Sequence, residues 1–177
     1  MKPADLIALI EANHLSTKTI TVDRNEFVKT AGTVDTDIYF VEEGSLRVFV
    51  VDEAEERTIR FGYQNNILVS LDSFLTGKPS EFVIQAIKKT RLRVIPKARF
   101  MEFLNGDEAH LRIWVAILED LVIQQIEREK DLLTASPKER YGRVLKRSPQ
   151  LFQEIPNRHI ANYLRMTPET LSRLKKS

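Results

Sequence analysis

Three polar residues near the C-terminal end of the sequence, Glu169, Ser172 and Arg173, have the side-chain types that read DNA bases. At a spacing of i, i+3 and i+4, they share one face of a helix. Arginine can donate two hydrogen bonds to a guanine edge, glutamate can accept one from a cytosine amine, and serine can serve either role. The pattern predicts a surface that recognises a base sequence, although an ordinary exposed helix could show the same three residues.

The segment around these residues predicts two short helices joined by a turn, at residues 156–166 and 167–176. Thr167 before Pro168 is a favourable helix start, because the threonine hydroxyl accepts a free backbone N–H and proline at the first helical position loses no hydrogen bond. Two helices that meet through a tight turn form a helix-turn-helix. The apolar residues recur at helical spacing and would form its small core: Ile160, Ala161, Leu164, Leu171 and Leu174.

Positive charge is concentrated in the same part of the chain. Residues 134–177 contain ten Lys or Arg and three acidic residues, a net charge of +7, whereas the rest of the chain has a net charge of −5. This asymmetry is typical of a DNA-binding module attached to a domain of another kind. It favours double-stranded DNA as a partner, and it favours base reading over a plain surface helix.

The composition excludes several classes of protein. The 177 residues are 42% hydrophobic and 29% charged, which is ordinary for a folded globular chain. The absence of cysteine excludes disulfides, cysteine-ligated zinc and iron–sulfur clusters. No apolar run is long enough to span a membrane and no signal-peptide core follows Met1, so we expect a cytoplasmic protein with no membrane partner.

Residues 17–95 alternate in short runs of Val, Ile, Phe and Tyr, separated by Gly, Asp, Asn and Glu, which predicts an antiparallel β sandwich or barrel. Residues 42–45 predict a hairpin, because Gly44 can take a positive φ. A second break at residues 52–56 predicts an acidic, solvated hairpin tip. Short helices are expected on either side of the strands, at residues 3–13 and 97–104.

Residues 107–133 carry one uninterrupted helical pattern with two apolar stripes. One stripe, formed by Trp114, Ile117 and Leu121, would cover the β domain. The other approximates a heptad seam and would pair with a second copy of the chain, which predicts a homodimer. The alternative is a single long core helix in a monomer. The predicted dimer seam consists of Leu111, Val115, Leu118, Val122 and Ile126.

The order of these segments resembles the Crp/Fnr family of bacterial transcription regulators. The resemblance rests on T-P-E-T-L-S-R at 167–173, H-I-A-N-Y-L at 159–164, S-P-K-E-R-Y at 136–141, and G-T-V-D-T-D-I-Y-F-V-E-E-G-S-L-R-V at 32–48. It implies an α+β fold with an N-terminal antiparallel jelly roll like that of cyclic-nucleotide-binding domains, a dimerisation helix and a helix-turn-helix. The implied domains are residues 1–106, 107–133 and 134–177.

The resemblance also implies roles for individual residues. Glu169, Ser172 and Arg173 would read bases on a palindromic operator, and RNA polymerase would be a further partner. One departure is Arg165, where helix-turn-helix turns often have glycine. An arginine there either adopts a strained turn conformation at a cost of about 1 kcal/mol, or the turn differs slightly. The residues expected to contact DNA phosphates are Thr170, Lys175, Lys176 and Arg158.

The effector site departs further from the family. Relatives that bind cyclic AMP hold the ribose with Gly-Glu and the phosphate with Arg followed by Ser or Thr; the matching positions here are Ser70-Leu71 and Ser80-Glu81. A carboxylate opposite a phosphate opposes binding, although Lys78 could reach the phosphate instead. We therefore expect no cyclic AMP binding of the usual kind, no certain cofactor, and a small unidentified effector at these five residues.

Three readings of the function stay open. One is a sequence-specific transcription regulator that is controlled by an unidentified effector. Another is a regulator of the same type that responds to cyclic AMP through a divergent cassette. The third is a ligand-sensing dimeric adaptor that does not bind DNA. An enzyme is not expected, because His14, His110 and His159 stand in three separate segments and no catalytic or metal-ligating motif is present.

Overall fold

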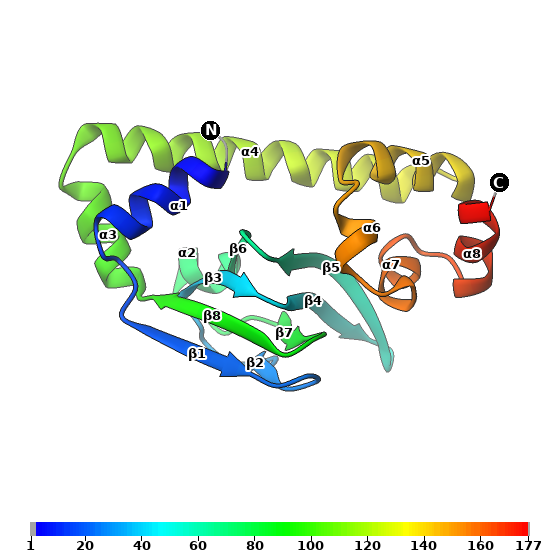
Figure 1. The fold of residues 1–177 in the computed structure, drawn as a ribbon, viewed down its shortest axis with the longest axis horizontal. Helices are drawn as coiled ribbons and strands as arrows, with labels where there is room; N and C mark the ends of the chain where they lie inside the picture. The colour runs from blue at the N-terminus through cyan, green and yellow to red at the C-terminus, as the bar shows by residue number, and fades with distance from the viewer. Residues whose placement is uncertain (1–2, 177) are drawn as a thin grey trace.

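The computed structural model describes residues 3–176, so residues 1–2 of the predicted first domain and residue 177 of the last lie outside the described part. The chain runs from a short helix through eight strands into a series of helices (Figure 1). The strands are β1 (Lys18–Val22), β2 (Phe27–Lys29), β3 (Ile38–Glu43), β4 (Ser45–Asp52), β5 (Glu55–Tyr63), β6 (Ile67–Val69), β7 (Val83–Ala86) and β8 (Thr90–Ile95). The helices are α1 (Pro3–Ala12), α2 (Leu71–Thr76), α3 (Lys97–Asn105), α4 (Glu108–Leu133), α5 (Pro137–Arg147), α6 (Leu151–Glu154), α7 (Asn157–Tyr163) and α8 (Pro168–Lys176).

The strands form two four-stranded sheets, in the orders β1-β8-β3-β6 and β2-β7-β4-β5. All pairings between strands are antiparallel. The alternating apolar residues of both sheets meet in one core, where Val41, Leu46, Ile84 and Leu92 are fully buried. The predicted α+β fold with an antiparallel β domain, a long helix and C-terminal helices is confirmed.

The predicted hairpin at residues 42–45 is wrong. Strand β3 pairs with β8 and β6, while β4 pairs with β5 and β7, so the chain crosses from one sheet to the other at Gly44. Gly44 has φ 91°, and a Cβ there would lie 2.4 Å from the carbonyl oxygen of Lys89. The glycine is therefore needed for a sharp corner and a close backbone contact, and not for a hairpin turn.

The predicted acidic hairpin tip does join neighbouring strands. Strands β4 and β5 pair in register up to Asp52 opposite Glu55, and the two residues between them, Glu53 and Ala54, have φ of 49° and 67°. Both tip residues are exposed. Positive φ at both central positions suits the twist of a two-residue hairpin even without glycine.

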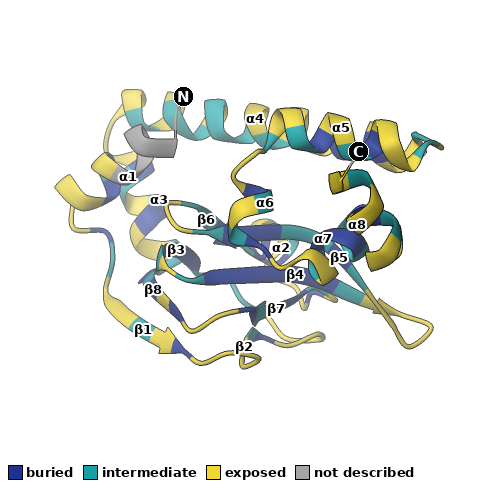
Figure 2. Cartoon of the chain, turned by 45° about the vertical axis from the view of Figure 1, so that its right-hand side comes forward, coloured by how far each residue is buried: buried dark blue, intermediate teal, exposed yellow. Residues whose placement is uncertain are grey.

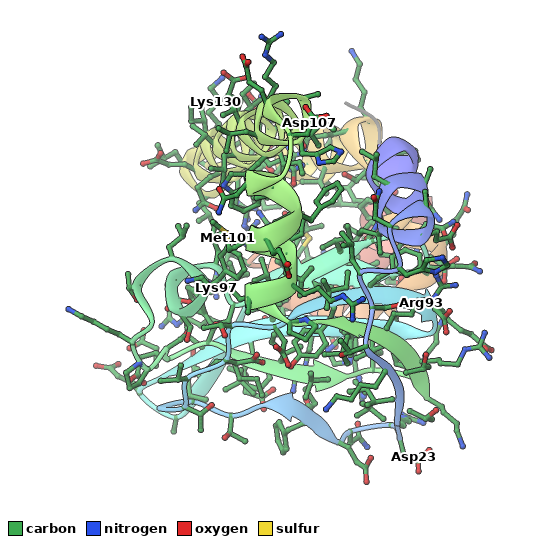
Figure 3. The ribbon with its side chains drawn as sticks, turned by 90° about the vertical axis from the view of Figure 1, so that its left-hand side faces the viewer. Asp23, Arg93, Lys97, Met101, Asp107 and Lys130 are labelled. Carbon is green, nitrogen blue, oxygen red and sulfur yellow. The ribbon has the colours of Figure 1, made fainter. Side chains whose placement is uncertain are left out.

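Helix α3 links the sheets to α4. In Figure 3 it rises from Lys97 through Met101 to Asp107, where α4 begins. Asp107 caps α4 by accepting a hydrogen bond from the Ala109 N–H at 2.8 Å. Aromatic rings pack at the junction of α3 and α4. The ring centroid of Trp114 on α4 lies 5.5 Å from that of Phe100 and 5.8 Å from that of Phe74.

The two stripes of α4 have different surroundings. Trp114 and Ile117 pack against the cluster around Phe74 and Phe100, as predicted for the inward stripe. Four of the five seam residues are exposed, with Val122 at 59%, and α4 has exposed stretches along its length (Figure 2). Leu118 alone of the five seam residues is half-buried. Within residues 3–176, no helix is both long and apolar enough to cross a bilayer.

The C-terminal helices do not stand apart from the β domain. Their core is built from Val144, Ile160, Leu164 and Leu171, and Phe61 of β5 belongs to the same buried cluster. Helix α5 starts with the predicted cap, since Ser136 Oγ accepts the N–H of Glu139 at 3.3 Å. The C-terminal helices are thus held against β5 and the end of α4 (Figure 1).

Candidate nucleic-acid interface

Helices α7 and α8 are joined by a tight turn at residues 164–167. Arg165 has φ 53°, so it adopts the left-handed conformation expected for it. Thr167 then starts α8, because its hydroxyl accepts the N–H of Thr170 at 3.2 Å. The buried faces of both helices meet at Ala161 and Leu171, which are fully buried. This packing fixes the direction in which the opposite face of α8 points.

Arg140 stabilises the turn, a role that the sequence analysis missed. Its side chain is 7% exposed and donates to the carbonyls of Leu164 at 2.6 Å, Arg165 at 3.2 Å and Thr134 at 2.5 Å. The guanidinium therefore satisfies carbonyls that the strained turn would otherwise leave without partners. The available signal was its position four residues before Val144, on the apolar side of α5.

The three predicted base-reading residues are exposed on one face of α8 (Figure 2). Hydrogen bonds from its own backbone N–H and from the Thr167 hydroxyl hold the pKa of Glu169 below its usual value. The carboxylate is consequently an acceptor at neutral pH. Arg173 lies close to Thr170, with 3.5 Å between Nη2 and Oγ1, and its guanidinium remains exposed.

The residues predicted to contact phosphates are divided between two places. Lys175 and Lys176 are exposed at the end of α8, and Lys175 donates to Asn157 Oδ1 at 2.8 Å. Thr170 is half-buried within the first turn of the same helix. Arg158 instead lies on α7, where its Nε is 3.1 Å from His159 Nε2. The structure brings the two lysines and Thr170 together on α8, and it places Arg158 elsewhere.

Arg158 and His159 line a cavity of about 350 Å³ between α7 and the β domain, together with Arg47 and Glu56. Burial, together with the positive charges of Arg47 and Arg158, lowers the pKa of His159 to about 4. His159 is therefore neutral at pH 7 and accepts from Arg158. His110 has a local packing role, because it stacks on Phe103 with ring centroids 3.9 Å apart.

Asn162 joins α7 to the edge of β5. Its Oδ1 accepts the Thr58 N–H and its Nδ2 donates to the Glu56 carbonyl, both at 2.8 Å. The amide thus pairs with the strand as a neighbouring strand would. Phe61 packs on Tyr163 next to it, with ring centroids 5.4 Å apart. Asn162 was not identified from the sequence, where a polar residue beside Ala161 gives no sign of a partner 104 positions away.

A buried ion-pair network joins α4 to α5. Asp131 is fully buried and accepts from Arg143 Nε at 3.0 Å and from Arg147. Glu127 accepts from Arg143 at 3.0 Å. Because both arginines lie on α5, the network fixes how the C-terminal helices sit against the end of α4.

Comparison with known proteins identifies the β domain. The family model "Cyclic nucleotide-binding domain" matches residues 19–107. The chain belongs to the cyclic nucleotide-binding domain family. No curated protein sequence matches it.

Solved structures with the same fold include FixK2 from Bradyrhizobium japonicum, with a TM-score of 0.75 and 16% identity over 90% of this chain and 82% of that one. A CooA variant from Carboxydothermus hydrogenoformans has a TM-score of 0.71 and 17% identity, over 94% of this chain and 77% of that one. The c-di-GMP responsive regulator CLP from Xanthomonas campestris has a TM-score of 0.68 and 14% identity, over 97% of this chain and 90% of that one. The resemblance to Crp/Fnr regulators is thereby confirmed for the fold, and it spans the helices as well as the β domain.

In this member of the cyclic nucleotide-binding domain family, residues 70–81 are predicted to correspond to the phosphate-binding cassette. Buried polar groups of this loop form hydrogen bonds within the chain. Ser70 and Ser80 are 1% exposed, and Ser70 Oγ donates to Asp72 at 3.1 Å. The buried ammonium of Lys29 donates to the carbonyls of Thr30 at 3.0 Å, Ser80 at 3.0 Å and Phe82 at 2.6 Å.

The other predicted effector residues are more accessible. Lys78 and Glu81 are exposed, and Leu71 is half-buried. None of the five residues lines the 350 Å³ cavity or the larger one described below. The effector pocket at these residues stays a prediction.

Proposed function

We propose that the protein is a homodimeric, sequence-specific DNA-binding transcription regulator of the Crp/Fnr type, in which α7 and α8 form a helix-turn-helix. The observation that carries the proposal is the exposed face of α8, where Glu169, Ser172 and Arg173 lie together on a helix that is anchored by the fully buried Leu171. A carboxylate, a hydroxyl and a guanidinium on a fixed helix are the groups that read base edges in a major groove.

The surroundings of α8 support this role. Lys175 and Lys176 extend the same helix with positive charge suited to phosphates. The turn before α8 is held by Arg140, so the helix is presented in a defined direction. The fold is shared with CLP, a protein that links signalling to gene expression.

The exposed seam of α4 supports the homodimer. Leu111, Val115, Val122 and Ile126 are each 46–59% exposed, a continuous apolar stripe that a second α4 would cover. Two copies paired along this seam would offer two α8 helices to a two-fold symmetric operator. The effector of the regulator is addressed separately below.

The DNA proposal is tested by selecting a preferred sequence from random duplexes and then measuring binding by fluorescence anisotropy over a salt series. Affinity should fall steeply as salt rises. Arg173→Ala should reduce discrimination at one base position by about 1–3 kcal/mol, while Lys176→Ala should weaken all sequences alike and lower the salt slope by about one. Equal behaviour of the two variants would contradict base reading by Arg173.

The dimer is tested by sedimentation. Val122→Glu places a charge in the seam and should shift the protein to monomers. Gln153→Glu adds the same charge at an exposed position of α6 and should leave the dimer intact. A dimer that binds no duplex at low salt would instead support a ligand-sensing adaptor.

A further inference from the structure

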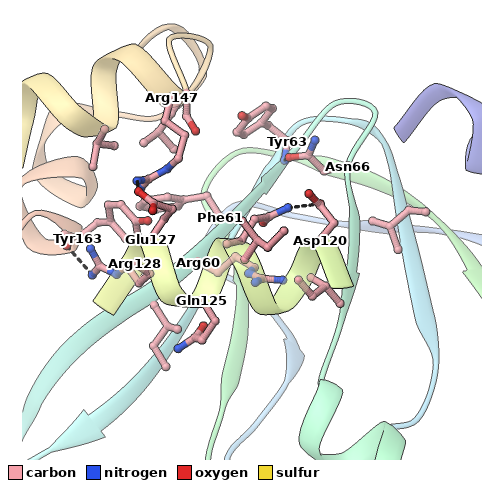
Figure 4. A pocket seen from close by; sticks show the side chains of 18 of the residues that line it. Arg60, Phe61, Tyr63, Asn66, Asp120, Gln125, Glu127, Arg128, Arg147 and Tyr163 are labelled. Carbon is pink, nitrogen blue, oxygen red and sulfur yellow. Dashed lines mark hydrogen bonds and ion pairs between the residues drawn. The ribbon is translucent and has the colours of Figure 1, made fainter. Parts of the chain in front are cut away.

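A second cavity lies between the β domain and the C-terminal helices. It has a volume of about 570 Å³, and its walls come from β5, α4, α5 and α7 (Figure 4). A cavity of this size accommodates a metabolite of moderate size. It is distinct from the loop that corresponds to the phosphate-binding cassette, since residues 70–81 contribute nothing to its walls.

Two guanidinium groups on the walls lack counterions in contact. Arg128 is 6% exposed; its Nη2 donates to the Tyr163 carbonyl at 2.6 Å, but its Nη1 has no hydrogen-bond partner within the described part of the chain. Arg60 pairs with Val48 through its backbone, but its side chain forms no ion pair or hydrogen bond with the residues that the structure describes. Burial lowers the pKa of both side chains, which means that their charges are poorly solvated.

The charges of Asp120 and Asp131 act to raise the pKa of Arg60 and of Arg128 respectively, but neither carboxylate forms an ion pair with these arginines within the described part of the chain. Asp120 accepts from Gln124 at 2.6 Å, and Glu127 accepts from Lys130 at 2.8 Å and from Arg143 at 3.0 Å. Arg147, the third arginine of the cavity, is already paired with Asp131. Arg60 and Arg128 are therefore the two arginines of the cavity that no described carboxylate contacts, and a bound anion would pair with their charges directly.

The remaining wall suits a flat apolar group. Phe61, Tyr63 and Tyr163 line the cavity, and the Arg128 guanidinium lies 3.7 Å from the centroid of the Tyr163 ring. Figure 4 shows these aromatic side chains on the same walls as Arg60 and Arg128. Aromatic faces and forked donors together favour a ligand that combines a planar apolar part with an oxyanion.

We infer that this cavity binds a small organic anion, a phosphate or carboxylate that carries a planar apolar group, with Arg60 and Arg128 as its charge partners. The ligand would touch both the β domain and the helices that hold α8. That such a ligand regulates DNA binding rests on the proposed function, whereas the binding itself does not.

The site is tested by titration calorimetry of the full chain with 1-naphthyl phosphate, 1-naphthoate and uncharged 1-naphthol. At least one of the two anions should bind, and 1-naphthol should bind at least about tenfold more weakly, because it cannot pair with the arginines. Arg60→Met should weaken anion binding about tenfold or more, and Arg60→Lys should weaken it less. Arg99→Met, which removes an exposed arginine from α3, is the matched control and should leave binding unchanged.

The inference is overturned if neither anion binds, if 1-naphthol binds as tightly as the anions, or if Arg60→Met binds like the unmodified chain. DNA binding is measured in a separate titration without these probes. A chain that binds an anion but no duplex would retain the site and refute the proposed function. A chain that binds a duplex but neither anion would refute the site alone.

Discussion

The buried cation Lys29 contrasts with two cations of the 570 Å³ cavity, the buried Arg128 and the half-buried Arg60. Three backbone carbonyls surround the Lys29 ammonium within 3.0 Å, and one of them belongs to Ser80 of the predicted effector site. Arg60 and Arg128 line the 570 Å³ cavity between the β domain and the C-terminal helices. Arg128 Nη1 has no hydrogen-bond partner among the described residues. A buried charge with full hydrogen bonding stabilises its surroundings, whereas one without it is tolerated only where something else meets its charge.

His159 adds a third outcome. It is also a base held in a partly buried site beside other positive charges, but an imidazole can give up its proton. Lys29 is satisfied by carbonyls and His159 becomes neutral, whereas Arg60 and Arg128 must stay charged because the pKa of arginine is too high for the proton to be lost. The two unmet arginines therefore carry more information about a missing ligand than the other two residues.

The largest effect is expected at Lys29. Lys29→Met should lower the free energy of unfolding by about 3 kcal/mol, because it leaves buried carbonyls without a donor. Urea denaturation measures the change, with Lys78→Met as the control, since Lys78 is an exposed lysine in the adjoining loop. If both variants were equally stable, Lys29 would not be a satisfied structural cation and the contrast with Arg60 would fail.

The satisfied role of Lys29 also shows where prediction from sequence stops. Periodicity predicted the strands, the two stripes of α4 and the exposed face of α8, because each depends on neighbours within a few positions. Even the left-handed Arg165 followed from its place in the turn. Lys29 meets Ser80 and Phe82 across more than 50 positions, and no local pattern indicates that contact.

The same limit explains the error at Gly44 and the omission of Asn162. A glycine between two apolar runs indicates a change of direction, but the sheet that each run joins is set by distant pairings, of β3 with β8 and of β4 with β7. Asn162 and Arg140 act on backbone groups of other segments, and any exposed polar residue could fill such a role. Side chains that bond to distant backbone groups are the part of the site that required the structure.

A smaller effect is expected at Asn162, which holds α7 against β5 and so fixes two walls of the cavity. Asn162→Ala should destabilise the chain by about 2 kcal/mol, because the buried Thr58 N–H loses its acceptor. Hydrogen exchange at Thr58 should then accelerate about tenfold or more, while the exposed substitution Gln153→Ala should not alter it. Unchanged protection of Thr58 would mean that the contact does not hold α7 to the strand.

The effect at His159 depends on pH. Its folded pKa of about 4 lies below the unfolded value near 6.5, so between these limits only the unfolded chain binds the proton. The contribution to stability is complete above pH 6.5 and is lost as the pH falls towards 4. After allowance for partial solvent screening, the unmodified chain should lose about 1 kcal/mol more than His159→Gln between pH 7.5 and pH 5. A parallel pH dependence of the two proteins would show that His159 is not held neutral.

The smallest effect on stability is expected at Arg60, and it separates the two kinds of buried cation most sharply. Arg60→Met removes a charge that no described residue pairs with, so without ligand the stability should be unchanged within about 0.5 kcal/mol or should rise by about 1 kcal/mol. Urea denaturation in a buffer without phosphate or carboxylate measures this. A loss of 2 kcal/mol or more would mean that Arg60 is as structural as Lys29. Near-equal stability together with lost anion binding would assign Arg60 to a ligand, because the residue would then contribute to binding and not to folding.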